Sequence, residues 1–230
     1  YQAWKEDINA LGQGSLQGRL DTPLMRRASS EGEAAPRSSQ ALLECNFDES
    51  ILALFTEVHY WEKFQGEFGI PYTAHDLCNQ RDKLRIMREQ VMLVVRAYNA
   101  IIVDLSPEER RLFSDHIRRL DKRINQGLTK LTWAAKGAVE IYVRDCCAHA
   151  SDVHGVIKTF KTGKQTISNT CRWIANLMLL KIDKNMVYDE AEFGAKQADH
   201  RDYVKKCFRD RHVVIKDVMK SMYVHFKEGS

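Results

Sequence analysis

Two glycine-containing stretches are the first residues in this sequence that could do chemistry, because glycine-rich loops can hold phosphate groups. A superficial similarity to a phosphate-binding loop is present at Gly12-Gln13-Gly14-Ser15-Leu16-Gln17-Gly18, and a similarity to the end of such a loop at Gly163-Lys164. Such a loop needs a preceding strand and a following helix whose first amide groups point at the phosphate, and neither flank is indicated. Gln165 also replaces the hydroxyl residue that would bind magnesium. We therefore expect a plain loop at residues 12–18 and a weak point of a helix, with a kink or short break, near Gly163.

Histidine and serine residues offer two further arrangements. His149 and His154 are five residues apart and lie on different faces of a helix, whereas a zinc pair on a helix needs a spacing of about four and further ligands nearby. Ser106, Asp115 and His116 are the residue types of a nucleophilic triad, but Asp115 neighbours His116 along a helix instead of facing it. The sequence therefore predicts no catalytic, cofactor-binding or metal-binding residue.

Basic residues form two short groups. Arg26-Arg27-Ala28-Ser29 places two arginines before a serine in an expected loop, where phosphorylation would add negative charge. Arg118-Arg119 and Lys122-Arg123 form a basic patch, but acidic residues are interleaved with it and no exposed aromatic residue suggests base stacking. We expect a solvated face that can pair with an acidic partner, and no nucleic-acid partner.

The elements that must position these residues are helices. Between Val139 and Met178 the apolar residues keep an alternating three-then-four spacing, which is a heptad seam that must be buried against another helix. Its members are Val139, Val143, Cys146, Ala150, Val153, Ile157, Phe160, Ile167, Cys171, Ile174 and Met178, with Lys164 as the one break. A continuous helix of this length measures roughly 60 Å at about 1.5 Å per residue. Long helices build rods and arrays, and they are poor material for a compact catalytic pocket.

Five other helical stretches are predicted, at residues 1–11, about 49–64, about 73–105, 107–127 and about 191–226. The strongest local signal is Leu105-Ser106-Pro107-Glu108-Glu109, where Ser106 is the N-cap, Pro107 the first helical residue and Glu109 the reciprocal acid of a capping box. The helix that begins there must fold back antiparallel on its predecessor, because the connection is short. Trp133 follows this hairpin, and we expect it to be buried as a wedge against the long helix.

The predicted fold class is all-α, an elongated helical bundle array that contains an antiparallel helical hairpin and long heptad-patterned helices. Residues 1–41 read as a short helix and a variable linker, with the linker at Ala28–Gln40, and residues 42–230 as one helical segment. No β-alternation of useful length is present. The chain begins with Tyr1 instead of methionine, and we expect it to be a fragment of a longer protein.

Composition agrees with a globular helical chain. The 230 residues are 44% hydrophobic, which suffices for a core, and the net charge of +4 comes from 35 basic and 31 acidic residues spread over the whole length. The six cysteines form no CxxC pair, and we interpret them as reduced residues, with Cys146 and Cys171 on the seam. No apolar run could span a bilayer and no signal peptide is present, so no membrane partner is expected.

Several sequence runs resemble, in order and spacing, the N-terminal tail of dynein heavy chains. They are Leu42-Leu43-Glu44-Cys45-Asn46-Phe47-Asp48, Glu57-Val58-His59-Tyr60-Trp61-Glu62, Ile70-Pro71, Leu84-Arg85, Tyr98-Asn99-Ala100-Ile101-Ile102, Leu105-Ser106-Pro107-Glu108-Glu109-Arg110, Leu112-Phe113, Leu120-Asp121 and Gly127-Leu128-Thr129-Lys130-Leu131-Thr132-Trp133. The resemblance covers about Leu42 to Ala150 and is looser beyond Asp152, while residues 28–40 look like a variable insertion. These runs resemble axonemal heavy chains more than cytoplasmic ones, and Tyr60-Trp61-Glu62 favours a heavy chain of a two-headed inner arm.

The resemblance implies a non-catalytic tail segment of a ciliary motor. Such a tail joins its heavy chain to another dynein heavy chain and to intermediate and light chains, and it anchors the assembly to a doublet microtubule in the cytoskeleton of a cilium or flagellum, the axoneme. ATP and magnesium are expected only in the ring of ATPase modules, which these residues do not include, so no cofactor is expected here. The alternative is a generic helical scaffold or spectrin-like tethering rod unrelated to motors. That alternative explains the heptads but leaves the Asn46-Phe47-Asp48 and Leu128–Trp133 runs unexplained.

Overall fold

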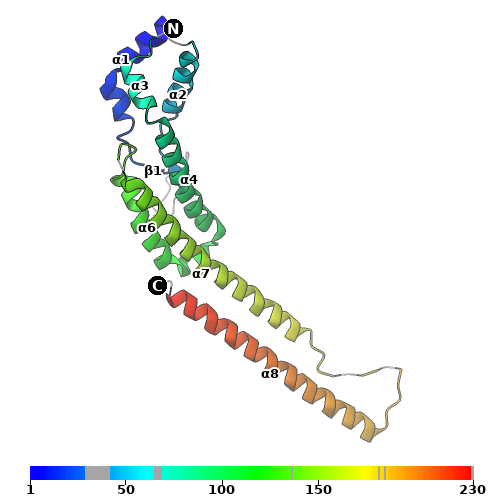
Figure 1. Ribbon diagram of the computed structural model, residues 1–230. Coiled ribbons are helices and arrows are strands. Elements are labelled where there is room, and N and C mark those ends of the chain that lie inside the picture. The colour runs from blue at the N-terminus through cyan, green and yellow to red at the C-terminus, as the bar shows by residue number, and fades with distance from the viewer. Residues whose placement is uncertain (29–41, 65–68, 136, 181, 184, 229–230) are drawn as a thin grey trace. The chain divides into compact units, whose positions relative to one another are not determined.

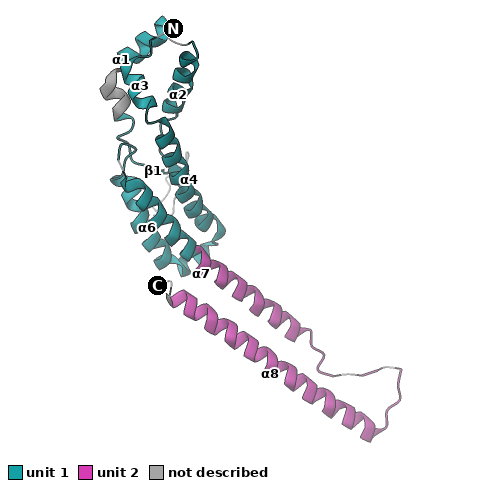
Figure 2. Cartoon of the chain, viewed as in Figure 1, with its two compact units in different colours: residues 1–153 teal, residues 154–230 magenta. Residues whose placement is uncertain are grey.

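A computed structural model describes residues 1–28, 42–64, 69–135, 137–180, 182–183 and 185–228, apart from the side chains of 11–17 and 228 (Figure 1). The elements follow in the order α1 (Gln2–Gly18), β1 (Met25–Arg27), β2 (Leu43–Cys45), α2 (Glu49–Glu62), α3 (Tyr72–Cys78), α4 (Arg81–Asp104), α5 (Pro107–Leu112), α6 (Ser114–Thr129), α7 (Ala138–Ala175) and α8 (Glu190–Glu228). The predicted all-α class is confirmed, since the only sheet among the described residues is one small two-stranded ribbon. Contacts divide the chain into two compact units, residues 1–153 and 154–230 (Figure 2).

The ribbon of β1 and β2 was not predicted from the sequence. The two strands pair antiparallel, with Met25 opposite Cys45 and Arg27 opposite Leu43. Strands of three residues are too short for an alternation of apolar and polar residues to be recognised, so the sequence does not predict them. Met25 and Leu43 of the ribbon are fully buried, as is Leu24, which precedes β1. The predicted linker at residues 28–40 lies, except for Ala28, outside the described residues.

Three predicted helix boundaries are wrong. The helix expected over residues 1–11 continues as α1 to Gly18, so its glycines do not end it and the loop expected at 12–18 is helical. The helix expected over 73–105 breaks at Asn79, because α3 packs against α1 and α2 whereas α4 packs against β2. The helix expected over 107–127 breaks at Phe113, which is fully buried where α5 turns into α6.

The predicted capping box is confirmed, and it also ends the preceding helix. Ser106 Oγ accepts from the Glu109 amide at 3.3 Å, and the Ser106 amide donates to Glu109 Oε2 at 3.2 Å. The Arg110 guanidinium reaches back and donates to the carbonyls of Ile102, at 2.9 Å, and Leu105, at 3.1 Å. Those carbonyls lie at the end of α4 and lack partners in their own helix. One turn therefore satisfies the end of α4 and the start of α5.

Trp133 is buried as predicted, with 2% of its surface exposed. Its indole Nε1 donates to the Asn46 carbonyl at 2.7 Å, and its ring meets Phe47 edge-on with centroids 4.8 Å apart. The main chain beside it is tied to the N-terminal strand region, since the Leu24 amide donates to the Leu131 carbonyl at 3.0 Å. Trp133 therefore joins the connection before α7 to the loop that follows β2.

The heptad seam of the long helix is confirmed only in its first half. Residues from Val139 through Ile157 on the seam are buried, but Cys171 is exposed, and Met178 lies beyond the end of α7 at Ala175. Thr170 is buried in place of Cys171. In the second half of the helix the buried positions are Gly163 and Thr170, one residue before the Lys164 and Cys171 positions of the strict heptad.

Gly163 allows close packing between α7 and α8, which run antiparallel side by side within residues 154–230 (Figure 1). The helix is continuous through Gly163, so the expected kink or break is not found. A Cβ atom added there would overlap the side chain of Met222 and come within 3.2 Å of Val218. Gly155, eight residues earlier in the same helix, has no atom within 4 Å of an added Cβ.

Trp133→Ala should lower the free energy of unfolding by about 3 to 5 kcal/mol, through lost contacts and the cavity that remains. Trp133→Phe keeps the ring contact with Phe47 but loses the bond to the Asn46 carbonyl, and it should cost less. Urea unfolding followed by circular dichroism measures both changes. A loss below about 1 kcal/mol for Trp133→Ala would contradict its role in the core.

Replacement by alanine should have different effects on stability at Gly155 and at Gly163 of α7. Gly155→Ala should stabilise the chain by about 0.5 to 1 kcal/mol, because alanine favours the helix and meets nothing. Gly163→Ala should lack this gain, since Met222 must first move aside. Thermal unfolding of the two variants makes the comparison, and an equal gain for both would show that α8 does not approach Gly163.

Candidate functional site: surfaces for partner chains

The residues considered above for chemistry do not assemble into a site. Ser106 is held by its capping bonds, and Asp115 forms an ion pair with Arg118 at 3.1 Å. His116 is buried and its ring contacts Phe113. Within the described ranges, no group of three or more histidine, cysteine or acidic side chains could hold a metal ion. No helix in this part of the chain is both long and apolar enough to cross a membrane.

Polar side chains instead fasten the ribbon to the helices. Asn99 of α4 accepts from the Leu43 amide at 2.8 Å and donates to the Leu43 carbonyl at 2.9 Å. Arg27 of β1 donates to Asp121 of α6 at 2.7 Å and to the Tyr98 hydroxyl at 2.7 Å. Tyr98 in turn donates to Asp121 at 2.9 Å. Burial raises the pKa of Tyr98 to about 12, so its hydroxyl keeps its proton and remains a donor.

This cluster changes the interpretation of two sequence signals. Arg26 and Arg27 were considered as part of a modification motif, but Arg27 is occupied by Asp121 and Tyr98, and Arg26 by Glu44 at 2.9 Å. Asp121, which belongs to a run that resembles the dynein tail, is a packing partner and not a ligand-binding residue. Because these polar side chains bind one another, a candidate binding site in this unit has to be sought among its exposed residues.

The first such surface is a groove between α6 and α7, which we call the α6–α7 groove. It has a volume of about 940 Å³ and is lined by Arg119, Lys122, Arg123, Gln126, Leu131, Ala138, Ile141, Tyr142, Arg144, Asp145, Ala148 and His149. Ile141, one of the lining residues, is 62% exposed. Arg123 and Asp145 neutralise one another through a 2.6 Å ion pair. Lys122 of α6 and Arg144 of α7 form no ion pair with any described residue, so each helix contributes a positive charge to the groove.

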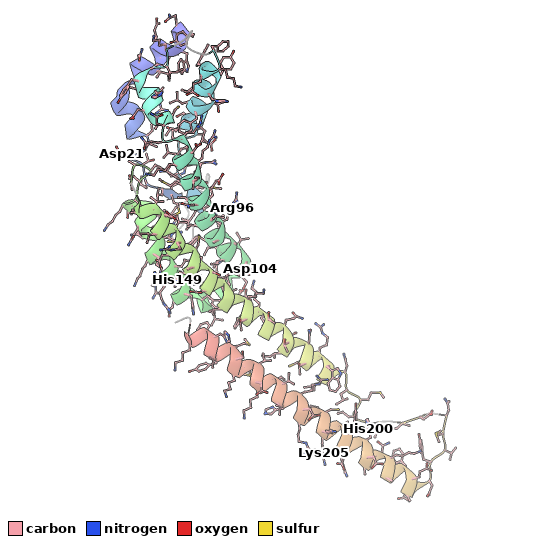
Figure 3. All side chains as sticks on the ribbon, viewed as in Figure 1. Asp21, Arg96, Asp104, His149, His200 and Lys205 are labelled. Carbon is pink, nitrogen blue, oxygen red and sulfur yellow. The ribbon has the colours of Figure 1, made fainter. Side chains whose placement is uncertain are left out.

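His149 closes one end of the groove, and Figure 3 labels it on α7. Its Nε2 atom is buried and has no hydrogen-bond partner among the described residues. Burial lowers the pKa of His149, and the positive charge of Arg123 lowers it further, although Asp152 and Asp145 act in the opposite direction. The imidazole is therefore neutral at pH 7.

The basic residues that α6 contributes to this groove were predicted as part of a surface patch, but Arg144 and Ile141 of α7 were missed. The signal was present, because Ala138, Ile141 and Ala148 are spaced by three and seven residues and fall on a face of α7 beside the buried seam. A second small stripe next to a main seam indicates a helix that contacts more than one neighbour.

The second surface is on the pair of α7 and α8 within residues 154–230. Phe160, Ile167 and Ile174 recur every seven residues on α7 and are half-buried, while Phe208, Met219 and Tyr223 are exposed on α8. In an antiparallel pair, residues displaced in the same rotational sense from the contact line lie on the same side. These six residues therefore form one side of the pair, which we call the hairpin face.

The other side of this pair differs in chemistry. It is a groove of about 320 Å³ lined by Lys158, Thr159, Thr162, Gly163, Thr166, Val218, Ser221 and Met222. Nearer the α7 end, Arg211 lies over the ring of Trp173 at 4.4 Å from its centroid. His200, labelled in Figure 3, contacts the Met178 carbonyl at 2.9 Å. Small hydroxyl side chains and a covered tryptophan leave the hairpin face as the apolar side.

The fold and these surfaces define a class of protein, a helical scaffold with exposed apolar side chains on its long helices. Comparison with known proteins gives the family. The family described as the N-terminal region 1 of dynein heavy chains matches residues 1–141. The chain belongs to the dynein heavy chain family, as the sequence resemblance implied, and it corresponds to a non-catalytic segment of the N-terminal tail.

The relatives are axonemal and flagellar heavy chains. Human dynein axonemal heavy chain 2 is 37% identical over 227 residues, and the mouse protein of the same name 34% over 230, each alignment covering 99% of this chain. The 1-beta heavy chain of the flagellar inner arm I1 complex from Chlamydomonas reinhardtii is 36% identical over 195 residues, or 84% of this chain. The chain spans only 4 to 5% of the length of these three relatives.

Acidification should expose the depressed pKa of His149. Its pKa is lower in the folded than in the unfolded chain, so the unfolded state binds more protons as the pH falls. The stabilising difference is complete above the ordinary histidine pKa of about 6.5 and is lost as the pH falls from there toward the folded value. Urea unfolding at neutral and mildly acidic pH should therefore show less loss of stability in His149→Gln than in the wild type.

His154→Gln is the matched control, because His154 is exposed on another face of α7. This variant should keep the loss seen in the wild type. Identical pH profiles for the wild type and His149→Gln would contradict the lowered pKa of His149.

Proposed function

We propose that this chain is a tail segment of an axonemal dynein heavy chain that joins it to another heavy chain and to intermediate and light chains. Through that assembly the segment helps to anchor the motor to a doublet microtubule in the axoneme of a cilium or flagellum. Family membership supports the tail assignment, and the names of the relatives support the axonemal setting. The observation that carries the joining role is the hairpin face, an apolar stripe at helical spacing on two adjacent helices.

The occupant that fits the hairpin face best is a helix of a different heavy chain. Phe208 is 42% and Met219 58% exposed, so a third helix would bury substantial apolar surface there. Five exposed basic residues of α8 flank this stripe, namely Arg201, Lys205, Arg209, Lys216 and Lys220. A second copy of this segment would place these charges against one another, which disfavours a dimer of identical segments. An arm with two different heavy chains agrees with this, and one relative is named as a heavy chain of a flagellar inner arm complex.

The test substitutes exposed residues of the hairpin face in the complete heavy chain. Phe208→Asp and Met219→Asp should leave the helix content of the segment unchanged, because both side chains are exposed, yet each should remove most co-purification of the second heavy chain. Placing a carboxylate in an apolar contact costs several kcal/mol. Ile157→Asp is less informative, since Ile157 is buried and its loss would unfold the pair.

Val213→Asp is the matched control for this test. Val213 lies on the same helix and is 55% exposed, close to the value for Met219, but it points away from the hairpin face. This variant should co-purify like the wild type. Equal recovery of the second heavy chain by all three variants would reject the hairpin face as the joining surface.

A further inference from the structure

The α6–α7 groove has the chemistry of a docking site for a particular kind of helix. Its apolar lining includes Ile141, which is exposed, and the small residues Ala138 and Ala148. Lys122 on α6 and Arg144 on α7 also line it, and neither forms an ion pair with any described residue. Apolar lining residues with a basic residue from each helix match a helix that has one apolar stripe with acidic residues on its flanks.

We propose that the α6–α7 groove binds an acidic amphipathic α-helix from another subunit of the assembly. The small side chains of Ala138 and Ala148 let a helix approach closely on either side of Ile141. The groove follows α7 from Ala138 to His149, a length of about 16 Å at about 1.5 Å per residue, which is about three turns of a partner helix. Carboxylates on the flanks of the helix pair with Lys122 and Arg144.

Nucleic acid fits the groove less well than a helix. Among the described residues the rings that line it are Tyr142, which is buried with its hydroxyl donating to the Ile124 carbonyl at 2.9 Å, and the half-buried imidazole of His149. Neither ring is exposed, which disfavours base stacking. Asp145 adds negative charge inside the groove, which would repel a phosphate backbone, and Ile141 offers a phosphate nothing to bind.

The proposal deepens the proposed function, because it assigns partner chemistry to a second surface of the same tail segment. The two are separable, since the α6–α7 groove lies within residues 1–153 and the hairpin face within 154–230. If Met219→Asp loses the second heavy chain but the groove binds no acidic helix, only the groove proposal fails. If the groove binds the acidic helix but Met219→Asp retains the second heavy chain, only the assignment of the hairpin face fails.

The experiment titrates the chain of 230 residues with three synthetic peptides of about 20 residues, a length at which isolated helices begin to be stable. The first has leucines at three-four spacing flanked by glutamates, the second has the same composition in scrambled order, and the third replaces glutamate with lysine. Binding is read from the ring resonance of His149, assigned with His149→Gln, because this residue lines the groove. Only the first peptide should shift it saturably, and salt should weaken that binding.

Variants locate the contacts. Lys122→Glu combined with Arg144→Glu should weaken the first peptide by about tenfold or more, as expected for two lost charge pairs, and Ile141→Asp should abolish saturable binding. Lys83→Glu combined with Arg85→Glu, two exposed basic residues of α4, is the charge-matched control and should bind like the wild type, as should Met219→Asp.

Three results would overturn the proposal. They are no saturable shift with the first peptide, equal binding of the scrambled peptide, and unchanged affinity in the Lys122 and Arg144 double variant. Duplex DNA and anionic vesicles are titrated in parallel. A stronger His149 shift with either of them than with the first peptide would assign the groove to that class of ligand instead.

Discussion

The unit formed by residues 1–153 depends on how the backbone of Leu43 is satisfied. Strands of three residues make a marginal ribbon by themselves, and the Leu43 amide and carbonyl point away from β1. The side-chain amide of Asn99 bonds both groups at 2.8 and 2.9 Å, so it acts as a neighbouring strand would. Because Asn99 sits within α4, this pair fixes the ribbon to that helix. Arg27 on the partner strand is then held where it reaches Asp121 of α6.

Local sequence patterns predicted local structure but not long-range contacts. The capping box could be predicted because its residues are three apart, and the burial of Trp133 because a large aromatic residue follows the helical hairpin. The ribbon could not be predicted, since β1 and β2 are separated in sequence and the side chain that stabilises the ribbon comes from α4. The break at Asn79 was hidden for a similar reason, because α3 and α4 pack against different elements. In both cases the deciding partner is distant in the chain.

The candidate surfaces show the same division. The basic residues from Arg119 to Arg123 were visible in the sequence, and so was the apolar repeat of α7. The sequence does not show that the basic residues form one wall of a groove, because this depends on the distance at which α7 packs against α6. Nor does it show which side of the α7 and α8 pair is apolar. The bulk of Met222 opposite Gly163 rotates the contact line away from the strict heptad, which leaves Phe160 and Ile167 half-buried at its edge.

Several residues that carry the family resemblance form buried or half-buried contacts within the chain. Asn46 and Phe47 meet Trp133, Tyr98 and Asp121 hold Arg27, and Asn99 holds Leu43. Such residues specify how the tail folds, whereas its partners must be recognised by exposed groups such as Ile141, Lys122 and Met219, which lie outside those runs. Membership of the family therefore establishes the scaffold, and only the exposed side chains can determine which chains this tail joins.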